Sequence, residues 1–98
     1  MHYEEFIVSL KKSEPPQDLS KPGQAMWWDA KGYWDKAHAI AQDVPDLNGS
    51  WIHAYLHRKE GDNGNAGYWY NRAGRDFPLT NIDEEAKEII IHVLSINN

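Results

Sequence analysis

The chain has 98 residues, of which 41% are hydrophobic and 26% are charged, so it suits one domain with its own core and is unlike a disordered polyanion. A formal net charge of −5 disfavours binding to nucleic acid, because that binding depends on Lys and Arg displacing counterions from phosphates. The absence of cysteine excludes disulfides and thiolate chemistry and favours a reducing compartment.

The N-terminal segment is predicted to form a short amphipathic helix over residues 3–12. Its apolar side chains recur at intervals of three and four, which places them in one stripe: Tyr3, Phe6, Ile7 and Leu10. Pro15-Pro16 ends the helix, and Ser20 with Pro22 can open the next one. The acidic N-terminus is unlike a secretory signal, and no apolar stretch approaches membrane-spanning length. We therefore expect a cytoplasmic protein that does not bind a membrane.

The central part of the chain repeats with a period of 29 residues. A shift of 29 superimposes three pairs of small residues, at 25 and 54, 32 and 61, and 37 and 66, and places Trp28 on His57. In each unit a helical run, 24–31 or 50–60, stops at a glycine, and a second run, 33–42 or 65–74, follows almost at once. Glycine adopts the left-handed conformation that ends a helix, and so short a connection makes the two helices antiparallel. We expect two helical hairpins, at about 21–44 and 50–76.

The second unit resembles the tetratricopeptide superfamily. The residues that carry this resemblance are Ala54, Tyr55-Leu56, Gly61-Asp62, Ala66, Tyr70 and Ala73. The first unit departs from the pattern at Val44, and the period is shorter than the usual value of about 34. The resemblance implies a shortened, degenerate relative. Residues 27–74 also resemble a group of small bacterial proteins of unassigned function, which implies a bacterial, cytoplasmic source.

The last segment is predicted to form a helix over about 81–96 that caps the second hairpin. Asn81 followed by Glu84 is a capping-box pattern, and acidic residues in the first turn suit the positive end of a helix dipole. A broad apolar face follows: Ile82, Ala86, Ile89, Ile90, Val93 and Ile96. The chain is therefore predicted to be a single all-α domain over 1–98, with about five helices arranged as two hairpins between an N-terminal helix and a C-terminal capping helix.

The resemblance also implies a binding face. In tetratricopeptide-like arrays the first helices of the hairpins line a concave surface, which here corresponds to Met26, Asp29, Trp51, Tyr55 and Arg58. Trp, Tyr and Arg are enriched in binding hot spots, and Arg58 would hold a peptide carboxylate through two hydrogen bonds. The alternative, which is favoured for Trp51 and Tyr55, is that these rings fill the core of a small domain.

A second candidate site is a metal site at His53, His57 and Glu60. These residues follow one another at intervals of four and three, so a single helix face would carry all three donors. The alternative, which is favoured, is that both histidines are polar packing residues at a helix interface. An acid/base group of His38, Asp35 and Lys36 with Glu60 would need these residues to converge, which the spacing does not show.

Residues 62–65, Asp-Asn-Gly-Asn, lack the carboxylate spacing of a calcium loop and favour a turn, with Asn65 a candidate helix cap. No cofactor motif is present. We expect a protein- or peptide-binding or scaffold module, with a homodimer through the Ile-rich last helix as one form, in preference to catalysis. The alternative is a small metal-dependent enzyme or metal-binding factor that uses His53 and His57.

Overall fold

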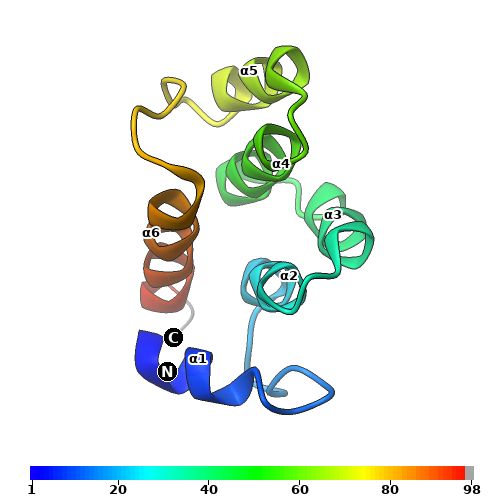
Figure 1. The fold of residues 1–98 in the computed structure, drawn as a ribbon, viewed down its shortest axis with the longest axis vertical. Helices are drawn as coiled ribbons and strands as arrows, with labels where there is room; N and C mark the ends of the chain where they lie inside the picture. The colour runs from blue at the N-terminus through cyan, green and yellow to red at the C-terminus, as the bar shows by residue number, and fades with distance from the viewer. Residues whose placement is uncertain (97–98) are drawn as a thin grey trace.

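The computed structural model describes residues 1–96, and all regular structure within that range is helical (Figure 1). The six helices are α1 (Tyr3–Ser9), α2 (Lys21–Ala30), α3 (Trp34–Gln42), α4 (Leu47–Lys59), α5 (Asn63–Arg72) and α6 (Ile82–Ser95). The all-α prediction is confirmed. The six helices of residues 1–96 are the two flanking helices and the four hairpin helices named from the sequence, one more than the predicted total of about five.

The two hairpins form as the repeat predicts, with α2 packed on α3 and α4 packed on α5. Gly32 and Gly61 close the first helix of each hairpin with φ angles of 91° and 88°, a conformation that strains any residue with a side chain. Ala37 and Ala66 are completely buried, which allows the paired helices to approach closely. Helix α3 also packs on α4, so the two hairpins form one continuous array.

Asx and Ser side chains set where several helices begin. Ser20 and Asn81 cap α2 and α6, as predicted, by accepting from the backbone N–H of Gly23 and Glu84. Helix α4 begins earlier than predicted because Asp46 accepts from the first-turn backbone N–H groups. Asp62 likewise begins α5 before Asn65, so Asn65 is a first-turn residue rather than the cap. Helix α1 is shorter than predicted and ends at Ser9.

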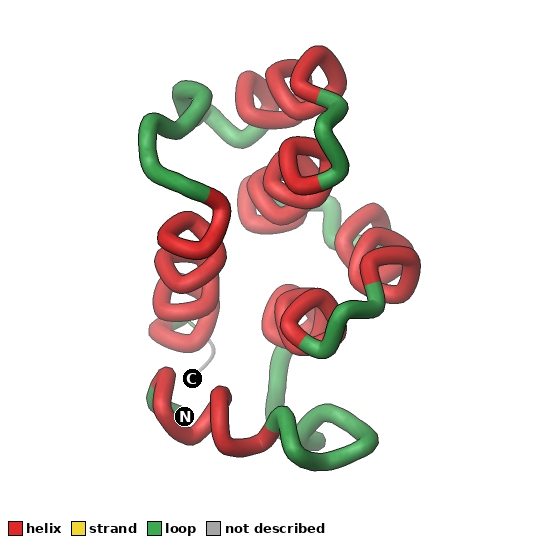
Figure 2. The backbone as a smooth tube through the Cα atoms, in the orientation of Figure 1, coloured by secondary structure: helices red, strands yellow, loops and turns green. Residues whose placement is uncertain are grey.

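Helix α6 covers the side of the array formed by α2 and α4 (Figure 2). It packs on both helices, so it spans the two hairpins instead of capping the second one alone. Its buried residues Ile89, Ile90 and Val93 join Phe6 from α1 and the apolar side chains of α2 and α4 in one core. The array is therefore closed on this side by the chain's own last helix.

None of the helices in residues 1–96 combines the length and the hydrophobicity that a membrane-spanning segment requires.

Candidate three-histidine site

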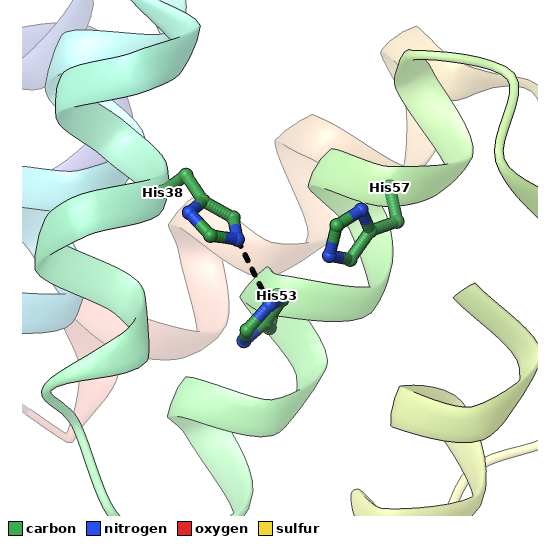
Figure 3. A group of neighbouring side chains, drawn as sticks. All are labelled: His38, His53 and His57. Atoms are coloured by element: carbon green, nitrogen blue, oxygen red, sulfur yellow. Dashed lines mark hydrogen bonds between the residues drawn. The ribbon is translucent and has the colours of Figure 1, made fainter. Parts of the chain in front are cut away.

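Three histidine side chains from two helices converge between α3 and α4 (Figure 3). His38 lies in the middle of α3, and His53 and His57 lie one turn apart on α4. Taking one nitrogen from each ring, the three atoms all lie within 4.8 Å of one another. His53 and His57 are buried, and His38 is half-buried. We call this group the three-histidine cluster.

The spacing of these nitrogens is close to that of a tetrahedral metal site. The Nε2 atoms of His38 and His53 are 3.0 Å apart. Ligands placed at zinc–nitrogen distances around a tetrahedral ion are separated by about 3.4 Å. The two Nε2 atoms share one hydrogen bond, so to hold a shared ion the donor ring must give up that proton and the rings must turn until all three separations match.

Two indole rings fix the orientation of the imidazoles. Trp34 of α3 stacks on His38 with ring centroids 4.9 Å apart, and Trp69 of α5 stacks on His53 at 3.9 Å. The Nε1–H of Trp34 donates to the backbone carbonyl of Leu56 at 2.8 Å, which ties the first hairpin to the second beside the cluster. The rings are therefore held by packing on both sides and do not depend on contacts with one another alone.

The environment favours the neutral form of His53 and His38. Burial lowers the pKa of His53 to about 4, and the proximity of His38 and His57 contributes to this shift. Burial, followed by the proximity of His57, also lowers the pKa of His38 below its ordinary value. A neutral imidazole offers a lone pair, which is the form that binds a metal ion.

Glu60 lies beside Nδ1 of the His57 ring. Its Oε1 lies 2.8 Å from Nδ1 of His57, so the carboxylate accepts the Nδ1–H and leaves Nε2 with its lone pair. Carboxylates commonly orient metal-binding histidines in this way. The sequence grouped Glu60 with His53 and His57 as three ligands. In the structure Glu60 instead belongs with His57 and Asp62, while His38 joins the two predicted histidines.

The other suggested acid/base residues do not join this cluster. The ammonium of Lys36 lies 4.0 Å above the ring of Trp28, within the first hairpin. Asp35 is exposed at the first turn of α3. The turn predicted for residues 62–65 is wrong, because residues 63–65 form the first turn of α5 and Asp62 is its N-cap.

The predicted concave face is covered by α6. Met26, Asp29, Trp51 and Tyr55 are all at most 5% exposed, and Arg58 is partly buried. The burial of Trp51 and Tyr55 therefore agrees with the alternative in which these rings fill the core. These side chains therefore have little contact with solvent while α6 is in place.

Arg58 does hold a carboxylate, but one that belongs to the same chain. Its Nη1 donates to Oε1 of the buried Glu85 on α6 at 2.8 Å. The other oxygen of Glu85 accepts from Trp51 Nε1 at 3.1 Å and from the Tyr70 hydroxyl at 2.6 Å. Burial, together with the bond to Glu85, raises the pKa of Tyr70 and keeps the hydroxyl a donor. We call this group the Glu85 cluster.

Asp29 forms a smaller group under the same helix. Its Oδ2 accepts from the Tyr55 hydroxyl at 2.6 Å, and its Oδ1 pairs with Lys59 at 2.9 Å. Burial, with the added effect of Asp29, raises the pKa of Tyr55. Among residues 1–96 no buried side-chain N or O atom lacks a hydrogen-bond partner, and in these two groups the donors face carboxylate acceptors, which is typical of a structural network.

His38 is the site residue that the spacing argument missed. The sequence feature that could have predicted its position is the short connection between residues 42 and 47, which makes α3 and α4 neighbours. His38 and His53 lie at similar distances from that connection, so they fall at the same level of two adjacent helices. Searching for histidines within one helix found only the pair separated by four residues.

Comparison with known proteins gives no match, whether to a family model, to a curated protein or to a solved structure.

Proposed function

We propose that this protein binds a divalent transition-metal ion, with zinc as the first candidate, through His38, His53 and His57. The observation that carries the proposal is the convergence of three ring nitrogens within 4.8 Å of one another. The lowered pKa of His53 and His38, and the carboxylate behind His57, give the donors the form that a metal requires. Imidazole nitrogen is a preferred ligand of zinc, copper and nickel.

The number of protein ligands bears on the type of site. Within residues 1–96 the three-histidine cluster contains three donor side chains. Structural zinc sites use four protein ligands, whereas three protein ligands with a fourth position for water or substrate are typical of catalytic ones. We therefore propose a site that exchanges its fourth ligand. This is the metal-binding alternative from the sequence, with His38 in place of Glu60.

A zinc titration followed by thermal unfolding tests the proposal. A ligand that binds only the folded state stabilises it by about 2.7 kcal/mol when the free ion is 100-fold above its Kd. We expect His38→Ala and His53→Ala to abolish this gain. His92→Ala is the matched control, because His92 pairs with Asn48 outside the cluster. An equal rise in melting temperature for all variants, or none for the parent protein, would contradict the proposal.

A second candidate function is the protein- or peptide-binding module that the sequence suggested. The observation in its favour is that the α2/α4 face binds a helix, α6, and holds its Glu85 through Arg58. We propose that a degenerate tetratricopeptide-like array of this kind would recognise an acidic amphipathic helix. Such a partner, or α6 of a second copy in a homodimer, would have to replace the chain's own α6.

The second candidate has its own test. Light scattering over a range of protein concentrations should detect a homodimer, and a pull-down should detect another protein. Arg58→Ala should weaken either interaction if the groove is the binding surface. If the protein is a monomer that captures no partner and its melting temperature depends on zinc, the binding-module proposal fails and the metal proposal stands. The cytoplasmic, bacterial origin expected from the sequence stays a prediction, which cell fractionation of the source would test.

A further inference from the structure

Asn65 lies at the edge of the three-histidine cluster and plays no part in the proposals so far. It belongs to the first turn of α5, where its backbone N–H donates to the Asp62 side chain at 3.2 Å. Its side-chain Nδ2 lies 3.4 Å from Nε2 of His57. Asn65 is exposed while His57 is buried, so the amide lies on the solvent side of the ring.

The hydrogen bonds of His57 define what the amide does there. Glu60 accepts the Nδ1–H, so Nε2 is the acceptor and Asn65 Nδ2 is the donor. A metal ion on Nε2 would take the same lone pair that the amide uses. The N–H of Asn65 would then lose its acceptor while remaining beside the ion. An acceptor atom in the ion's fourth coordination position would restore that hydrogen bond.

The charge of the loaded site favours an anion in that position. Three neutral imidazoles bring no negative charge into contact with a divalent ion. Glu60 and Asp62 keep their charges nearby, but they act as hydrogen-bond acceptors, Glu60 for His57 and Asp62 for the first turn of α5. An oxyanion with two oxygens can place one on the metal and accept a hydrogen bond with the other.

We propose that Asn65 is a positioning residue that selects a small oxyanion, of the carboxylate or phosphonate class, as the exchangeable fourth ligand of the metal. This inference rests on the proposed metal site and deepens it by naming the class of ligand that the site takes. The Asp62 cap holds the backbone of Asn65, from which the amide reaches His57.

Cobalt(II) is the probe for this inference, because its visible absorption reports both its binding and its coordination geometry. The protein is first titrated with Co²⁺, and the loaded protein is then titrated with acetate or methylphosphonate. We expect a saturable change in the visible spectrum with at least one of them. The two ligands distinguish a carboxylate site from a phosphonate or phosphate site.

Two substitutions at one position separate positioning from ligation. Asn65→Ala should leave cobalt affinity within about twofold and weaken oxyanion binding by roughly ten- to a hundredfold, the loss expected for one hydrogen bond to a charged group. Asn65→Asp should abolish the oxyanion response, because it puts a negative charge beside the fourth position. Asn71→Ala, an exposed change on the same helix, is the matched control and should behave as the parent protein.

The possible results are distinguishable. Cobalt binding with no oxyanion response overturns this inference and leaves the metal site standing. A large loss of cobalt affinity in Asn65→Ala also overturns it, because the side chain would then be a ligand itself. Failure of the parent protein to bind cobalt overturns both the inference and the proposed function.

Discussion

Helix α4 carries a polar cluster on each of two opposite faces. Successive residues turn by about 100° around a helix, so His53 and His57 lie on the face opposite Trp51, Tyr55 and Arg58. The first face meets α3 and α5, and the second meets α6. Both faces are largely buried, so burial alone does not distinguish them.

The difference lies in how the polar atoms match. In the Glu85 cluster one carboxylate accepts from a guanidinium, an indole N–H and a phenol, so each donor faces an acceptor. In the three-histidine cluster, side chains of one kind face one another, and the Nε2 atoms of His38 and His53 share a single hydrogen bond in which either ring can be the donor. A network of unlike partners stabilises a fold, whereas imidazoles that share one proton can release it and bind a cation together.

Removing the carboxylate from the complementary face should have the largest effect. Glu85→Ala leaves Arg58, Trp51 and Tyr70 without their buried acceptor, and breaking a buried pair by removing one partner costs about 3–5 kcal/mol. Urea unfolding should report this loss. Glu88→Ala, an exposed change on the same helix, is the control and should stay within about 0.5 kcal/mol. Equal stability of the two variants would show that the Glu85 cluster does not hold α6 on the array.

The smaller group at Asp29 should follow the same rule with a lesser effect. Asp29→Ala leaves the buried Tyr55 hydroxyl without an acceptor, and such a loss costs about 1–3 kcal/mol. Tyr55→Phe in the Asp29→Ala background removes the unpaired hydroxyl and should recover part of this loss. A double-mutant cycle by urea unfolding measures the coupling. Strictly additive effects would show that the hydroxyl and carboxylate do not act as a pair.

Local sequence patterns predicted most of the fold, because where a helix begins and ends depends on residues that are close together in the sequence. Gly32 and Gly61 ended their helices as expected, and Ser20 and Asn81 capped theirs. The start of α4 was missed because Asp46 follows Pro45 in a segment that looked like a connection. The position of α6 was harder, since its apolar stripe shows that it packs and does not show on which helices.

The site was predictable only in part for the same reason. His53 and His57 share a helix, so their spacing alone brings them together. His38 reaches them only through the packing of α3 on α4, and a pattern confined to one helix contains no information about that contact. Glu60 was found as a neighbour of His57, but its role behind the ring depends on the direction of the side chain.

In the absence of metal, the three-histidine cluster should make the free energy of unfolding depend on pH. His53 has a pKa of about 4 in the folded state against 6.5 in an unfolded chain, because of burial and then the nearby His38 and His57. Protons therefore bind preferentially to the unfolded state, and stability falls as the pH drops from 6.5 towards 4. The expected loss is about 1–2 kcal/mol after allowance for solvent near the site.

The matched variant for this measurement is His53→Gln, because the carboxylates of the protein also titrate at low pH. Urea unfolding of both proteins between pH 7.5 and pH 4, with a chelator present, isolates the contribution of His53 as the difference between the two curves. Parallel curves would mean that His53 is protonated as easily in the folded state as in the unfolded one.

The smallest effect is expected from His53→Leu in metal-free protein at a pH above 7. The substitution removes one nitrogen from the contact with His38, which is half-buried and can bond to water instead. It also puts an apolar side chain against Trp69 in place of an imidazole. Replacing a buried polar group in this way should change the free energy of unfolding by less than about 1 kcal/mol. The same variant should lose all stabilisation by zinc. If the three-histidine cluster served only to stabilise the fold, His53→Leu would show the opposite pattern. The metal-free protein would lose much of its free energy of unfolding, and its response to zinc would be unchanged.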